Sequence, residues 1–185
     1  MMLKLLHNAL ICAALIAVLL LGSALSVGAA DRSLFLALRT ADTPQKAALI
    51  AEEIRRHWRS EAGATASLLL DHADALIEAG DLRTARRKLT GVVEVQPDYA
   101  DGWARRGVFL RSLGRDGEAL SDLEMAVSLD PDHFAAHALI GEIREAEEDW
   151  GAALEAYRAA HDLYPLLPRP AHKTRVLGQL MGTDG

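Results

Sequence analysis

Two histidines have the spacing of a metal site. His133 and His137 are four residues apart, which can place two imidazoles on one face of a helix. Asp130 or Asp132 would then supply a third, carboxylate ligand. However, His133 stands at the start of its predicted helix, where we expect a surface position, and His137 takes the place of a packing aromatic, which predicts a half-buried ring. We therefore favour two structural histidines, predict no metal or other cofactor, and keep a His-based metal-binding protein as the least favoured alternative.

Other residues that could carry catalysis do not form a recognisable motif. His72 is flanked by Asp71 and Asp74, a combination in which a carboxylate could orient a general base. The glycines within residues 114–117 are not followed by Gly-Lys-Ser/Thr, so they do not form a phosphate-binding loop. The serines fall in ordinary helical or turn contexts. We predict no catalytic residue and a protein that is not an enzyme.

Basic residues gather in two short groups. They are Arg83, Arg86, Arg87 and Lys88, with Arg55, Arg56 and Arg59 as the second group. An anionic partner would suit such residues, but we favour a solvated outer helix face because the chain as a whole is acidic, with a net charge of −6. The same acidity argues against nucleic acid as a partner.

The first thirty residues have the pattern of an export signal. Lys4 precedes an uninterrupted apolar run over residues 9–21, and the stretch closes on small residues that end with Ala29 and Ala30. We predict a signal peptide over residues 1–30, cleaved after one of these two alanines. A leader of this bacterial style, together with the Ala- and Arg-rich composition, predicts a periplasmic protein.

The alternative is a leader that is retained as a membrane anchor. The uncharged residues 8–30 are long enough to cross a bilayer, which takes about 20 residues. The protein would then be a cell-envelope assembly factor, anchored in the inner membrane and facing the periplasm, and the membrane would be a partner only in that case. Cys12 lies inside the apolar run rather than at its end, so we do not expect a lipid attachment.

A period of 34 residues organises most of the remaining chain. Four columns of residues share it: Pro97, Pro131 and Pro165; Ala85, Ala119 and Ala153; Val95, Leu129 and Leu163; and Leu89, Leu123 and Tyr157. A fifth column of small residues contains Ala73, Gly107 and Gly141. A fixed period of this size is typical of a stacked array of structural repeats.

Each period contains two helical stripes of apolar residues with a turn between them. Proline ends the second stripe because it lacks an amide donor. Gly80 and Gly114 suit helix ends that need a left-handed residue. Glu148 stands in that place in the third period, so its turn should be strained or differently shaped. The predicted units are residues 66–99, 100–133 and 134–167.

Both flanks of the array should be covered by further helices. Residues 31–62 predict a divergent N-terminal helix pair that caps the stack, with Thr43 as the N-cap of its longer helix and Pro44 in the first turn. Residues 168–185 predict a short amphipathic capping helix and a tail.

These features resemble the tetratricopeptide repeat (TPR) family, and the second unit carries the best match. Its matching residues are Trp103, Arg106, Gly107, Leu110, Ala119, Leu123, Ala126 and Pro131. The resemblance implies an all-α fold, a right-handed superhelical solenoid of antiparallel helix pairs, whose concave face binds a peptide or a partner protein. His72 stands where the family favours leucine, which predicts a half-buried structural histidine rather than a general base.

The resemblance also implies which residues line the concave groove. They are Leu70, Asp74, Ile77, Glu78, Asp101, Val108, Arg111, Glu142 and Glu145. This groove has an apolar floor and an acidic rim with Arg111 as its only cation, so a neutral or basic protein segment is the expected partner. The paired Lys and Asn with which some members grip a carboxylate are missing, and that activity is not carried over. The groove could also be filled partly by the chain's own ends.

Overall fold

The structure is a computed structural model that describes residues 32–182, so the predicted leader lies outside the described residues. The regular elements of this part are all helices, which confirms the all-α prediction. A helix over residues 32–39 precedes α2. The others are α2 (Pro44–Ser60), α3 (Ala64–Glu78), α4 (Leu82–Val95), α5 (Ala100–Ser112), α6 (Asp116–Leu129), α7 (Phe134–Ala146), α8 (Trp150–Leu163) and α9 (Pro168–Met181). None of the helices described between residues 32 and 182 combines the length and hydropathy of a membrane span.

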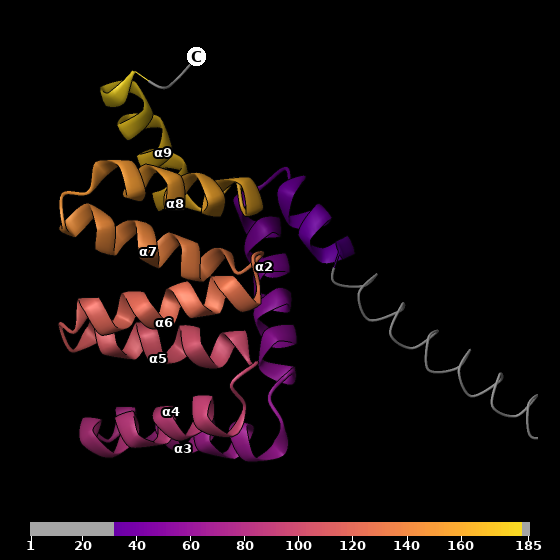
Figure 1. Cartoon of the computed structure of the whole chain (residues 1–185). Helices are drawn as coiled ribbons and strands as arrows, with labels where there is room; N and C mark the ends of the chain where they lie inside the picture. The colour runs from indigo at the N-terminus through magenta and orange to yellow at the C-terminus, as the bar shows by residue number, and fades with distance from the viewer. Residues whose placement is uncertain (1–31, 183–185) are drawn as a thin grey trace, which may run out of the picture.

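Helices α3 to α8 form three pairs that lie one above another (Figure 1). Each pair falls in one of the predicted units, except that α3 begins at Ala64, two residues before the predicted start. Helix α9 lies on the last pair, where Leu177 packs with Leu154 and Tyr157. The pairs therefore form a solenoid in which each apolar face is covered by a neighbour.

Glycine permits the close approach of the two helices within a pair. A Cβ atom on Gly107 would lie 2.9 Å from Cγ of Leu123 and 3.1 Å from the carbonyl oxygen of Ala119. In the third pair, a Cβ on Gly141 would lie 2.7 Å from Cδ1 of Tyr157. The contact around Gly107 and Ala119 thus leaves no room for a larger residue.

The turns inside the three pairs share one backbone conformation. Gly80 and Gly114 have φ of 77° and 71°, and Glu148 has φ of 61°. The third turn thus has the same left-handed shape as the other two, at the cost of strain in a residue that carries a Cβ. This is the first of the two outcomes that the sequence predicted.

The N-terminal helices do not cap the stack, and that prediction is wrong. Helix α2 runs across the ends of the pairs instead of stacking on the first one (Figure 1). Thr43 caps α2 as predicted, since its hydroxyl oxygen accepts a hydrogen bond of 3.3 Å from the amide of Lys46. The buried stripe of α2 packs against aromatic residues that begin α7 and end α8. This cluster contains Leu38, Ala47, Ala51, Ile54, Trp58, Phe134, Leu163 and Tyr164.

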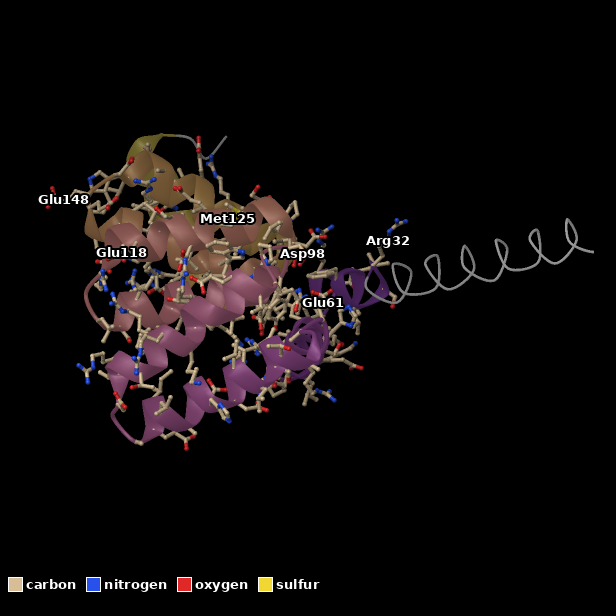
Figure 2. All side chains as sticks on the ribbon, turned by 60° about the horizontal axis from the view of Figure 1, so that its bottom comes forward. Arg32, Glu61, Asp98, Glu118, Met125 and Glu148 are labelled. Atoms are coloured by element: carbon tan, nitrogen blue, oxygen red, sulfur yellow. The ribbon has the colours of Figure 1, made fainter. Side chains whose placement is uncertain are left out.

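The two ends of the paired helices therefore have different surroundings. Figure 2 shows Arg32, Glu61 and Asp98 at the end where the N-terminal helices meet the pairs. Glu118 and Glu148 lie at the other end, near the turns inside the pairs. Helix α2 thus covers the side of the array where successive pairs are connected, and it does not cover the side that contains the turns inside the pairs.

Replacement of Gly107 by Ala should separate α5 from α6. The added methyl group meets a backbone oxygen as well as Leu123, so we expect Gly107→Ala to lower the free energy of unfolding by about 1–3 kcal/mol. Urea denaturation measures the change. Gly117→Ala is the matched control, because a Cβ there has no neighbour within 4 Å, and it should be neutral or slightly stabilising. Equal stability of the two variants would contradict the close-packing argument.

Candidate functional site

The candidate site is a hollow between α3 and α5 with a volume of about 450 Å³. Four of the predicted groove residues line it: Asp74, Ile77, Asp101 and Val108. Leu89 and Phe109, which were not predicted as groove residues, contribute core side chains to its wall. The predicted groove residue Leu70 is buried in the core of the first pair, so it does not reach a ligand.

The rim of this hollow is apolar and exposed. The side chains of Ile77 and Val108 are 37% and 56% exposed, although both are large aliphatic residues. Glu78 is exposed beside Ile77, in the last turn of α3. Ile77 lies on α3 of the first pair and Val108 on α5 of the second, and together they give the hollow an exposed apolar edge.

Asp101 belongs to a polar network rather than to a free acidic rim. Its Oδ2 accepts hydrogen bonds from the Tyr99 hydroxyl at 3.1 Å and from Arg105 Nε at 3.0 Å. Burial by itself would raise the pKa of Asp101, but the nearby His133 ring and Arg105 outweigh it and hold the pKa below its usual range. Burial beside this carboxylate raises the pKa of Tyr99, so the phenol stays protonated.

His133 is buried, so the prediction of a surface position is wrong. Its ring stacks on Trp58 with a centroid distance of 4.0 Å and an interplanar angle of 4°. Nδ1 accepts a hydrogen bond from the Ala136 amide at 3.2 Å, which caps α7, and Nε2 lies 3.6 Å from Oδ1 of Asp101. Trp58 covers His133 because α2 crosses this end of the stack, and a helix start would otherwise lie in solvent.

The two histidines do not form a metal site. His137 is half-buried as predicted, but its Nε2 lies 3.0 Å from the Pro131 carbonyl oxygen, whereas Nδ1 of His133 is used by the helix cap. Burial lowers the pKa of His137, which favours the neutral ring. Over residues 32–182, no three His, Cys, Asp or Glu side chains are arranged to hold a metal ion.

His72 is exposed, which corrects its predicted half-buried position. Helix α3 buries Ala66, Leu70 and Ala73, and residue 72 lies beside this stripe rather than on it. One period later the same position holds Arg106, which forms two hydrogen bonds of 2.7 Å with the carboxylate of Asp122. Arg106 is half-buried, so the equivalent position did not signal the exposure of His72.

The carboxylates that were predicted to form an acidic rim along the groove are paired with cations of the same chain. Glu142 lies 3.2 Å from Arg111 and 3.4 Å from Arg169, and Asp74 lies 3.4 Å from Arg105. Arg169 belongs to α9, so the prediction that Arg111 is the only cation of the groove is wrong. The reason is that the C-terminal helix returns over α7 and α8, which the repeat pattern does not describe.

Glu145 holds α9 at several points. Its carboxylate accepts a hydrogen bond of 2.7 Å from the Tyr157 hydroxyl, lies 3.4 Å from Arg169, and pairs with Lys173. Burial opposes the charged form, but the bonds from Lys173 and Tyr157 hold the pKa of Glu145 below its usual range. Glu142 and Glu145 therefore anchor α9 and are not free for a ligand.

Comparison with known proteins places the chain in a family. A tetratricopeptide repeat family model matches residues 70–132 and 117–168. The chain belongs to the tetratricopeptide repeat family, as the second unit predicted. The helix pairs and the hollow between α3 and α5 are thus those of a TPR array.

The most informative relatives are other TPR proteins. A TPR repeat-containing protein of Rhizobium etli is 33% identical over 132 residues, which are 71% of this chain and 65% of that protein. Tetratricopeptide repeat protein 37 of Xenopus laevis is 30% identical over 125 residues, 66% of this chain and 8% of that protein. The chain therefore spans less than two thirds of the length of these relatives.

Solved structures share the fold at lower identity. The first TPR domain of Spaghetti, bound to an HSP90 peptide, has a TM-score of 0.58 at 20% identity and covers 64% of this chain and 94% of that one. The MamA protein also has a TM-score of 0.58, at 22% identity, with 64% and 65% covered. These similarities establish a TPR solenoid.

Removal of the anchoring carboxylates should loosen α9. In Glu142→Gln/Glu145→Gln the pairs with Arg169 and Lys173 lose their charge, so we expect amide hydrogen exchange in α9 to become about tenfold faster. Exchange in α5 and α6 should not change. Glu155→Gln is the control, because Glu155 is exposed on α8. Unchanged protection of α9 in the double variant would show that Leu177 packing alone holds the helix.

Proposed function

We propose that the protein is a non-catalytic scaffold that holds a segment of a partner protein in the hollow between α3 and α5. The observation that carries this proposal is the exposed pair of Ile77 and Val108 at the mouth of the hollow. A related TPR structure contains a bound peptide, which supports a protein segment as the ligand. An aliphatic side chain of such a segment would cover both residues and remove them from water.

The charge of the hollow favours a neutral segment over a basic one. Our sequence prediction allowed both, because it assumed free carboxylates along the rim. Asp74 and Asp101, which line the hollow, already face Arg105, so they offer little attraction to a further cation. Glu142 and Glu145 lie on α7, outside this hollow, and are paired with Arg111, Arg169 and Lys173. Apolar contact with Ile77 and Val108 is the larger favourable contribution that remains.

The titratable groups beside the hollow also favour a binding role over a catalytic one. Asp101 is engaged by Tyr99 and Arg105, and His133 caps α7 and stacks on Trp58. A general acid or base must be able to reach a substrate and exchange its proton. These side chains instead hold helices together, which supports a binding role.

The groove is tested by replacing its apolar rim. We expect Ile77→Asp/Val108→Asp to reduce by about tenfold the amount of each partner that the wild type captures from an envelope extract, since two solvated carboxylates cannot be buried under an apolar side chain. Quantitative mass spectrometry measures the captured proteins. The control is Leu82→Asp/Met125→Asp, which changes two residues of similar exposure, 40% and 42%, on the second helices of their pairs. Retention of the partners by the groove variant, or equal loss in both variants, would argue against this site.

We propose in addition that the protein is exported to the bacterial periplasm and that its leader is removed. The apolar run over residues 9–21 and the small residues that end at Ala30 support this location. N-terminal sequencing of the protein from cells should find Ala30 or Asp31 as the first residue. A first residue within positions 1–8, with extraction from membranes only by detergent, would instead support an anchored envelope-assembly factor.

A further inference from the structure

A second hollow lies where α2 crosses α5. Its volume is about 330 Å³, and it is lined by Glu52, Arg55, Arg56, Arg59, Asp101 and Arg105. Four of these six side chains are arginines, in a protein whose net charge is −6. The basic residues of α2 are thus gathered in a concave site, apart from those of α4.

The packing of α2 fixes the direction of these arginines. Residues 52, 55, 56 and 59 have the spacing of a single helix face. The adjoining face is buried: Ile54 and Trp58 are in the core, and Trp58 is stacked on His133. Because the packing of Trp58 on His133 prevents rotation of α2 about its axis, the arginine face is held against the first turns of α5.

The carboxylates in this hollow are already used. Glu52 lies 3.0 Å from Arg55, and Asp101 lies 3.0 Å from Arg105, which also reaches Asp74 at 3.4 Å. By contrast, Arg56 and Arg59 are exposed and have no ion-pair partner among residues 32–182. Two guanidinium groups, one helical turn apart, therefore remain available at the rim of the hollow.

We propose that this arginine face of α2 binds an acidic segment of a partner protein. Guanidinium groups bind carboxylates through two parallel hydrogen bonds, and a peptide with neighbouring acidic side chains matches two arginines on consecutive turns. The sequence analysis favoured a solvated face for these arginines, but the structure gathers them with Arg105 in one hollow, which favours an anionic partner instead. The inference does not depend on the hollow between α3 and α5 being occupied. The two hollows share Asp101 and Arg105, so they are neighbours, and one partner can reach both.

The test uses fluorescein-labelled hexaglutamate as the probe and the full chain as the protein. Fluorescence anisotropy at low ionic strength should show binding that added salt weakens. Arg56→Gln/Arg59→Gln should weaken the binding about tenfold, because both free guanidinium groups are lost. Arg83→Gln/Lys88→Gln makes the same change of charge on α4, at residues that line no hollow described between residues 32 and 182, and should alter the affinity less than about twofold.

Several outcomes would overturn the proposal. Failure of the wild type to bind the probe removes its basis, and equal weakening by the two double variants shows that only total charge matters. Tighter binding of a DNA duplex or of phosphatidylglycerol vesicles through the same two arginines would replace an acidic protein segment as the partner. If Arg56→Gln/Arg59→Gln unfolds at the same temperature as the wild type, its loss of binding is not caused by a loss of fold. Binding of hexaglutamate by Ile77→Asp/Val108→Asp would show that the arginine face binds independently of the hollow between α3 and α5.

Discussion

The distance between the two helices of a pair is set where one of them carries glycine. At Gly107 the backbone of α5 lies directly against Leu123 and the carbonyl of Ala119, and at Gly141 the backbone of α7 lies against Tyr157. Because no side chain separates the helices there, the second and third pairs each have a single favourable separation. In the first pair the equivalent residue is Ala73, which is buried in the core between α3 and α4. The packing of the array therefore depends on small residues at this one position of each pair.

The charges buried inside the array are paired with one another. Arg106 pairs with Asp122, and Arg105 with Asp101. Buried pairs of this kind contribute little net stability, but they disfavour other arrangements of the helices because an unpaired buried charge is costly. Arg56 and Arg59 on α2 are instead exposed, although the chain as a whole carries a net charge of −6. Net charge alone would have suggested a basic partner.

The array itself was predictable from the sequence because its signals recur at a fixed distance. The columns that contain Gly107, Ala119 and Pro131 located the repeating units and their helices. The same comparison predicted that Glu148 would make its turn either strained or differently shaped, and its φ of 61° shows the strained form. Ile77 and Val108 were assigned to the groove through family resemblance, and the structure places both at the mouth of one hollow.

The positions of α2 and α9 were not predictable in this way. His133 is buried only because Trp58 of α2 covers it, and Glu145 is neutralised only because Lys173 of α9 returns over the last pair. These contacts join segments that are far apart in the chain and occur once, so no column records them. The sequence by itself determined the repeating helix pairs, since each residue's partner within a pair lies at a constant separation along the chain. Only the tertiary structure decided which ends are covered and which charges stay free, because that depends on where two non-repeating helices pack.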